Sequence, residues 1–146
     1  MAKRAQTTKH LSALERLQFE LEHPPYHDFL QPRAVSADAD NGVVEILLRY
    51  RPEFQRVRGE PAFHGGVISG LVDLTAHAAA AVKIGRMAPN IDVRIDYMRP
   101  AINTDLHAKG MVRRAGRTLA VVDVEIANDE GKLIAIARGI LSTVAG

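Results

Sequence analysis

The stretch between Gly65 and Gly85 constrains this chain more than any other part of its sequence. From Gly65 to about Ile84 it contains no proline, and alanine dominates its second half, which favours a helix. Gly85 stands where a helix commonly ends. Because apolar residues occupy most sides of this predicted helix, the rest of the chain must enclose it on most sides.

One side of the predicted helix carries small and polar residues instead. At the helical period they are Gly66, Gly70, Asp73, His77 and the pair Ala80 and Ala81. Small residues let another backbone or a ligand approach closely along this small stripe. An ionised carboxylate is costly to bury alone, so Asp73 needs solvent, a partner or a chemical role.

The segments around this helix predict a sheet. Residues 1–23 form an N-terminal helical extension, in which Ser12 and Glu15 can make a capping box. A hairpin over residues 33–50 precedes the long helix. The stretches after it, near residues 91–98, 105–114, 118–128 and 132–144, are four strands without the intervening helices of a doubly wound fold.

This order predicts an α+β fold in one domain, residues 1–146. One long antiparallel sheet curled around one apolar helix would bury that helix. The length suits a single core, and the sequence contains no repeat or linker that would mark a second domain.

The composition excludes several kinds of site. The chain has no cysteine, which excludes disulfides, a thiol nucleophile and thiolate metal ligands. The HExxH, SxxK and GxSxG motifs are absent, and His64 and His77 are too far apart for a helical metal pair. We therefore expect neither a metal nor a serine nucleophile.

The charge and hydropathy of the sequence indicate whether the protein binds nucleic acid or spans a membrane. The net charge is +2, and few aromatics accompany the basic residues, so binding to nucleic acid is not favoured. Asp73 and His77 interrupt the longest apolar run, so no membrane span is expected. With acidic residues following the basic N-terminus and no cysteine, a cytoplasmic protein is expected.

The start of the long helix offers an electrophilic site. Gly65 and Gly66 expose backbone N–H groups where the helix dipole is positive, and such groups can hold an anion or a developing oxyanion. Asp73 follows His64 by nine residues. A carboxylate near such donors is a workable arrangement for hydrolysis of an acyl group.

Structural explanations for the same residues stay open. The glycines after His64 can simply form a turn into the helix. His77 can be a packing residue whose nitrogens are satisfied within the core. Asp73 can be a buried residue held by hydrogen bonds.

Several motifs together resemble one family. They are HGGVISGLVDLTA (His64–Ala76), IDVRIDYMRPA (Ile91–Ala101), the strand–turn–strand Ala115–Gly139, and the entry segment PPYHDFLQPRAV. In combination these resemble the hot-dog fold acyl-CoA thioesterases of the phenylacetate-pathway (PaaI) type, over roughly residues 24–143.

The resemblance implies a hot-dog fold, a homodimer or homotetramer, and an active site at the subunit interface. The small stripe of the long helix would then face a partner subunit and a ligand. The N–H of Gly65, or its neighbour Gly66, would polarise the thioester carbonyl, and His64 would orient the thioester or the loop. Asp73 of the other subunit would act as nucleophile or as general base. No cofactor would be needed, since coenzyme A is part of the substrate.

The sequence departs from the family pattern just before the glycines. Many members carry Asn six residues before this histidine, where this chain has Arg58. The Ser or Thr common at the start of the next strand is also missing, and Asn90 or Ile91 falls there. Slower catalysis, an unusual substrate, or a polar role for Asn90 would each accommodate this.

Arginines near strand ends are candidates for the coenzyme A phosphates. They are Arg99, Arg113, Arg114 and Arg117. Arginine is favoured for phosphate, although each of these can be an ordinary surface charge. By position, Gly66, Arg58, Asn90 and His77 are the remaining candidates for contact with the substrate.

Two other functions compete with thioester hydrolysis. A non-catalytic acyl-CoA-binding protein on the same fold is compatible with Arg58 at the family's Asn position. A hot-dog dehydratase or hydratase is less favoured, because the Asp-x-x-x-x-His pair expected at a helix start is absent. Fold alone does not separate the three.

Overall fold

A computed structural model describes residues 7–144, and the first six residues of the expected extension lie outside that range. The elements, in chain order, are α1 (Ala13–Glu22), α2 (Pro25–Leu30), β1 (Arg33–Asp38), β2 (Val43–Leu48), the 3₁₀ helix η1 (Pro52–Phe54), α3 (Gly65–Ile84), β3 (Asn90–Tyr97), β4 (Leu106–Ala115), β5 (Leu119–Ala127) and β6 (Leu133–Ser142).

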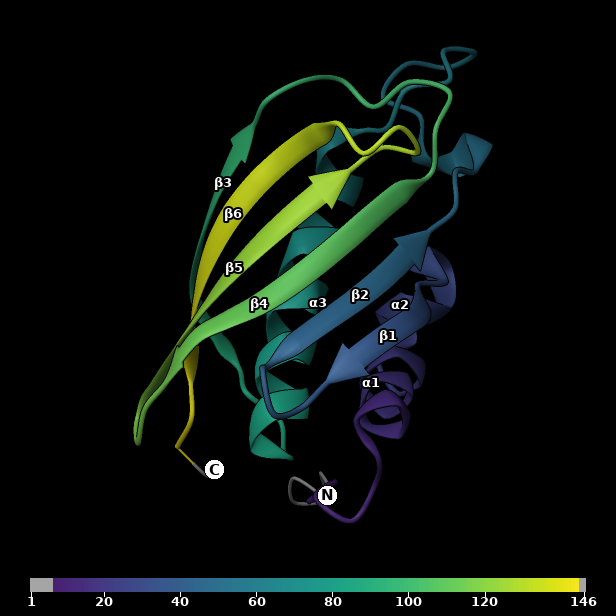
Figure 1. Ribbon diagram of the computed structural model, residues 1–146. Coiled ribbons are helices and arrows are strands. Elements are labelled where there is room, and N and C mark those ends of the chain that lie inside the picture. The colour runs from purple at the N-terminus through teal and green to yellow at the C-terminus, as the bar shows by residue number, and fades with distance from the viewer. Residues whose placement is uncertain (1–6, 145–146) are drawn as a thin grey trace.

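All of these strands belong to one curved antiparallel sheet. Its order is β1-β2-β4-β5-β6-β3, so β1 and β3 are the two edges. Figure 1 shows α3 lying along one face of this sheet, with α1 and α2 beside it near β1. The predicted α+β arrangement, including four strands after the long helix, is confirmed.

Helix α3 is the centre of the core. Gly85 ends it in the left-handed conformation at φ 74°, and its N–H donates to Ala81 O at 2.8 Å. By length and composition alone α3 is apolar enough to cross a membrane, as a buried core helix also can be, so the expectation of no membrane span stays a prediction. Within the fold, however, 61% of its most apolar stretch is buried, and the sheet supplies the cover that its apolar sides require.

Two glycines let the sheet approach α3 closely. A Cβ placed on Gly110 of β4 would lie 2.9 Å from Ala79 Cβ and 3.0 Å from Thr75 O. A Cβ on Gly139 of β6 would lie 3.2 Å from Ala76 Cβ. Such contacts are tighter than packed atoms normally make, so the small residues on α3 and these glycines fit each other.

We predict that Gly110→Ala destabilises the protein by about 1–3 kcal/mol, because the added methyl group forces the helix backbone and the sheet apart. Urea unfolding followed by circular dichroism measures this. Gly139→Ala is the matched control and should cost less, because its tightest new contact, with Ala76 Cβ, is 3.2 Å and the next, with Leu141 Cδ1, is already 3.5 Å. Equal stability of the wild type and Gly110→Ala would contradict this account of the packing.

Helix α1 closes a further side of α3. The predicted capping box is present: Ser12 N–H donates to Glu15 Oε2 at 2.8 Å, and Glu15 N–H donates to Ser12 Oγ at 3.3 Å. Arg16 Nη1 donates to Val82 O at 2.9 Å, near the end of α3. The N-terminal helix is thus docked on the central helix.

Candidate active site

The loop before α3 is held on both sides, which fixes where the helix begins. Phe54 of η1 is fully buried, and its carbonyl oxygen accepts from the His64 N–H at 2.7 Å. The Phe63 N–H donates to Ala101 O at 3.0 Å, in the segment after β3. The helix N-terminus is therefore anchored to the core and to the end of β3.

His64 caps α3 with its side chain. Its Nδ1 accepts from the Gly66 N–H at 2.8 Å, which places the ring proton of a neutral His64 on Nε2. The Gly66 N–H was expected to be available to a substrate, and in this structure the cap uses it. The role of His64 seen here is to satisfy one of the unpaired donors of the helix end.

The Gly65 N–H is the donor that remains. No group among residues 7–144 accepts a hydrogen bond from it. Tyr97, at the end of β3, donates from its hydroxyl to Gly65 O at 3.3 Å, and its ring would lie 3.7 Å from a Cβ at Gly65. The Tyr-x-Arg-Pro-Ala motif had marked this segment, but the hydroxyl contact was not predicted.

Asp73 lies on an exposed part of α3 and is held by Asn90. The Asn90 Nδ2 donates to Asp73 Oδ1 at 2.6 Å and to the Asp73 main-chain oxygen at 3.0 Å. Asn90 is the first residue of β3, so the strand aims the carboxylate. The other carboxylate oxygen has no hydrogen bond to the described chain and is free to accept one.

Within one chain, the donor and the carboxylate are too far apart to act on one carbonyl. Gly65 and Asp73 are eight residues apart on α3, which is about 12 Å along the helix axis. A reacting group must lie within about 3 Å of the N–H donor and within about 3 Å of the carboxylate. Gly65 and Asp73 of one chain are therefore two separate candidate half-sites.

His77 does not belong with Asp73. Its Nε2 lies 2.8 Å from Glu20 Oε2 of α1, and its Nδ1 lies 2.9 Å from Ala88 O, so both ring nitrogens are used within the chain. Burial lowers the pKa of His77, but the hydrogen bond and negative charge of Glu20 outweigh it and raise the pKa above its usual value.

The small stripe of α3 is therefore divided. Ala80 and Ala81 are fully buried, and His77 faces Glu20 rather than a ligand. The expectation that the whole stripe faces a partner and a ligand was wrong for this half, because α1 covers it. Tyr26 of α2 also approaches Gly70, where an added Cβ would lie 2.7 Å from the Tyr26 hydroxyl.

We predict that Glu20→Gln destabilises the protein most at acidic pH. Since the folded-state pKa of His77 is raised, its pair with Glu20 contributes fully below the unfolded pKa near 6.5, and this contribution is lost as pH rises through the folded value. We expect a loss of about 2 kcal/mol at pH 6 and less at pH 9, measured by urea unfolding.

The control for this pair is the exposed contact of His107 with Asp129, whose atoms lie 2.8 Å apart. Both of its side chains are about half exposed, so His107→Gln should change stability by less than about 1 kcal/mol. A Glu20→Gln penalty that grew from pH 6 to pH 9 would contradict the charged pair.

The structure separates the candidate arginines into two groups. The segment containing Arg99 lies beside the loop before α3, since Asn103 N–H donates to Pro61 O at 2.9 Å. Arg99 and Arg58 are exposed and come from these two adjoining segments. Arg113, Arg114 and Arg117 lie at or near the β4–β5 turn, at the other end of the sheet.

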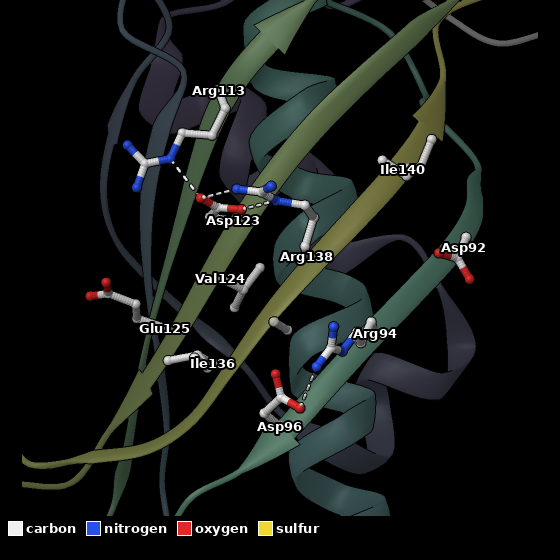
Figure 2. A pocket seen from close by; sticks show the side chains of 11 residues that line it. Asp92, Arg94, Asp96, Arg113, Asp123, Val124, Glu125, Ile136, Arg138 and Ile140 are labelled. Atoms are coloured by element: carbon white, nitrogen blue, oxygen red, sulfur yellow. Dashed lines mark hydrogen bonds and ion pairs between the residues drawn. The ribbon is translucent and has the colours of Figure 1, made fainter.

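A hollow of about 500 Å³ lies on the sheet face opposite α3, and neither Gly65 nor Asp73 lines it. Figure 2 shows Asp123 there, joined to Arg113 at 2.8 Å and to Arg138 at 2.7 Å. The hydrogen bonds of these arginines, that of Arg138 foremost, lower the pKa of Asp123. Arg113 thus forms an ion pair with Asp123. The Gly65 and Asp73 candidate half-sites, by contrast, lie on the open surface of a single chain.

No cluster of three or more His, Asp or Glu side chains suited to a metal ion occurs within residues 7–144.

Comparison with known proteins identifies the family. A family model described as the thioesterase superfamily matches residues 61–135, about half of the chain, including the start of α3, Asp73 and Asn90. The chain belongs to the thioesterase superfamily. A putative esterase of Saccharolobus solfataricus is 32% identical, and the match covers 76% of this chain and 77% of the relative.

Other relatives carry more specific names. The acyl-coenzyme A thioesterase PaaI of Escherichia coli is 36% identical over a match that covers 63% of this chain and 66% of its own. The solved structure of that PaaI protein superimposes with a TM-score of 0.78 at 24% identity, covering 92% of this chain and 98% of PaaI. The predicted hot-dog fold and the PaaI-like family are both confirmed.

Proposed function

We propose that this thioesterase-superfamily protein hydrolyses an acyl-CoA thioester to the free acid and coenzyme A. The observation that carries the proposal is the pair of half-sites: a free Gly65 N–H at the start of α3 and an Asp73 carboxylate aimed by Asn90. A second copy of the chain would bring its Asp73 to the Gly65 of the first, because the two groups are about 12 Å apart within one helix.

The proposed reaction needs one donor and one carboxylate. The Gly65 N–H binds the thioester oxygen and stabilises the negative charge that develops on it. In the general-base form, Asp73 takes a proton from water while the water oxygen attacks the carbonyl carbon. The tetrahedral intermediate then collapses, the C–S bond breaks, and the coenzyme A thiolate leaves with the electron pair.

Asp73 can also act as the nucleophile. Its carboxylate oxygen would attack the carbonyl carbon and expel the thiolate, giving a mixed anhydride that water then hydrolyses to the acid and free Asp73. The Asn90 bond at 2.6 Å leaves one carboxylate oxygen available in either form. A thiolate is a good leaving group, so neither form requires a metal or a prosthetic group.

The names of two relatives support an acyl-CoA substrate. Besides PaaI, the medium/long-chain acyl-CoA thioesterase YigI of Escherichia coli is 31% identical over 62% of this chain and 76% of its own. Arg58 and Arg99 offer exposed positive charge near the Gly65 end of α3, and guanidinium groups bind phosphate well. We propose that these two, rather than the arginines at the β4–β5 turn, contact coenzyme A.

We predict that Asp73→Asn lowers kcat by at least about a hundredfold, since the amide can neither accept the proton of water nor attack the carbonyl. Hydrolysis of a panel of aryl-CoA and fatty-acyl-CoA esters, followed by thiol release, measures this. The matched control is Asp40→Asn, which removes a carboxylate from an exposed turn away from Asp73. This variant should keep wild-type turnover. No turnover by the wild type across the panel, or an active Asp73→Asn, would reject the proposal.

We predict that Arg99→Ala raises KM for acyl-CoA about fivefold or more with little change in kcat, because a charge-assisted contact to phosphate is worth about 1 kcal/mol or more. The comparison substrate is the matching acyl-pantetheine thioester, which lacks the nucleotide phosphates and should be unaffected by the substitution. Arg117→Ala, at the far end of the sheet, is the control. A larger KM effect at Arg117 would reverse the assignment.

A second function remains on the same fold, that of an acyl-CoA-binding protein without turnover. Arg58 at the position where many family members carry Asn favours it. Saturable binding of a non-hydrolysable acyl-CoA thioether, together with no hydrolysis of the matched thioester, would establish that alternative. Turnover that is lost in Asp73→Asn would exclude it.

A further inference from the structure

His77 joins three parts of the fold at one point on α3. Its Nε2 lies 2.8 Å from Glu20 Oε2 of α1, and its Nδ1 lies 2.9 Å from the main-chain oxygen of Ala88. Ala88 is buried in the loop that runs from α3 into β3. Helix α1, helix α3 and that loop are therefore tied together through one imidazole ring.

Both contacts together require a proton on each ring nitrogen. A carboxylate and a carbonyl oxygen only accept hydrogen bonds, whereas a neutral imidazole has a single N–H to donate. Only the imidazolium form of His77 can therefore make both bonds. Glu20 is 8% exposed, and a carboxylate buried to that extent needs a positive partner, which the imidazolium supplies.

The bond to Ala88 bears on the aim of Asp73. Only Pro89 separates Ala88 from Asn90, and the ring of a proline fixes its own φ and restricts the residue before it. The link from the Ala88 oxygen to Asn90 is therefore short and stiff. Asn90 is the residue whose Nδ2 donates to the Asp73 carboxylate and to its main-chain oxygen.

These contacts close a ring with α3. In an α-helix the carbonyl of one residue accepts from the N–H four residues later, so the Asp73 main-chain oxygen belongs to the turn that carries His77. From this turn the contacts run through the imidazole to the loop, and through the Asn90 amide back to Asp73. Movement of the loop away from His77 would therefore open the contact between Asn90 and Asp73.

Strand β6 holds the other side of this loop. The Ser142 N–H donates to Pro89 O at 2.8 Å, and Asn90 pairs with Leu141. Such bonds lie in the plane of the sheet and do not fix its distance from α3. Asn90 Oδ1 is buried and has no hydrogen bond within residues 7–144, so Nδ2 alone orients the amide.

Charged groups from α1, α2 and α3 surround His77. Burial lowers the pKa of His77, but the hydrogen bond and charge of Glu20, with the charge of Asp73 one turn away, raise it above the usual value. His27 of α2 is close enough to act on the ring, and burial lowers the pKa of His27. The loop before β3 presents the Ala88 oxygen. The two histidines therefore titrate on opposite sides of the usual value, and the change above it belongs to His77.

We propose that the imidazolium of His77 is a positioning residue for the Asp73 carboxylate, which it keeps aimed by holding the loop before Asn90. The inference rests on the proposed function for the role of Asp73. His77 does not touch the substrate, and Glu20 of α1 acts by keeping both ring nitrogens protonated. Helix α1 is thereby coupled to the reaction centre without contacting it.

Loss of one proton from His77 would release the loop. The remaining N–H goes to the stronger acceptor, and a carboxylate is stronger than a main-chain carbonyl, so the proton stays with Glu20. The Nδ1 lone pair then faces the Ala88 oxygen, and that bond is broken. We therefore expect kcat to fall as pH rises through the pKa of His77, with KM little changed.

NMR spectroscopy tests this coupling without any substrate. The His77 Cε1–H signal reports protonation of the ring, and the Asn90 side-chain amide signals report the bond to Asp73. We expect both to change at one midpoint between about pH 6 and pH 9, and Glu20→Gln to lower both midpoints by about one pH unit. Asn90 signals that stay constant while His77 titrates would overturn the proposal.

The matched control removes a carboxylate from an exposed histidine pair instead. Asp129→Asn leaves His107, which is half exposed, without its partner. This variant should leave the midpoints of His77 and Asn90 in place. A shift as large as that in Glu20→Gln would assign the effect to net charge rather than to the bridge, and would count against the proposal.

Two amide replacements separate the two bonds of the ring. Asparagine places an N–H donor near the position of Nδ1 and glutamine near that of Nε2, so His77→Asn keeps the bond to Ala88 and His77→Gln the bond to residue 20. Each is combined with Glu20→Gln, so that no buried charge is left unpaired. We expect kcat within about threefold of wild type for the asparagine variant and about tenfold lower for the glutamine variant. Equal losses, or the reverse order, would contradict the role of the Ala88 bond.

Failure of the inference and failure of the function are distinguishable. A wild type that hydrolyses no acyl-CoA, but whose Asn90 amide follows the titration of His77, would reject the proposed function and keep the coupling. An active enzyme whose Asn90 amide ignores that titration would keep the function and reject the coupling. The expected result is an active enzyme whose kcat and Asn90 signals change at the same midpoint.

Discussion

The structure depends on the enclosure of one helix that is apolar on nearly every side. A single flat sheet can cover only one side of α3, so the sheet curves around it and α1 closes a further side. Glycines on β4 and β6 bring the strands close enough for tight packing. The sheet and α1 leave uncovered the side of α3 that bears Asp73 and its N-terminal end at Gly65, so both face solvent.

Local patterns in the sequence predicted most of the helices and strands. The absence of proline, the run of alanines and Gly85 predicted the bounds of α3, and spacing alone predicted the capping box of Ser12 and Glu15. The four strands after α3 followed from residue alternation and turn residues. These features depend on residues close together in sequence, where the periods of helices and strands are informative.

Contacts between distant segments were not predictable in the same way. Glu20 and His77 are 57 residues apart, and no sequence period links them. The sequence therefore did not predict that α1 covers half of the small stripe. The separation of the arginines into two ends of the sheet depends on strand order, which places Arg99 beside the α3 loop. Asn90 was expected to take part in the site, but its partner within the chain, Asp73, became known only from the structure.

The cap that His64 makes on α3 has a consequence for selectivity. By taking up the Gly66 N–H, it reduces a helix end that could hold an anion with several donors to one with a single free donor at Gly65. A thioester oxygen needs only one such bond, whereas a carboxylate or phosphate binds best when two or more N–H groups converge on it. Because His64 leaves one free donor, the helix end binds a carboxylate only weakly. A carboxylic acid is the product that thioester hydrolysis releases.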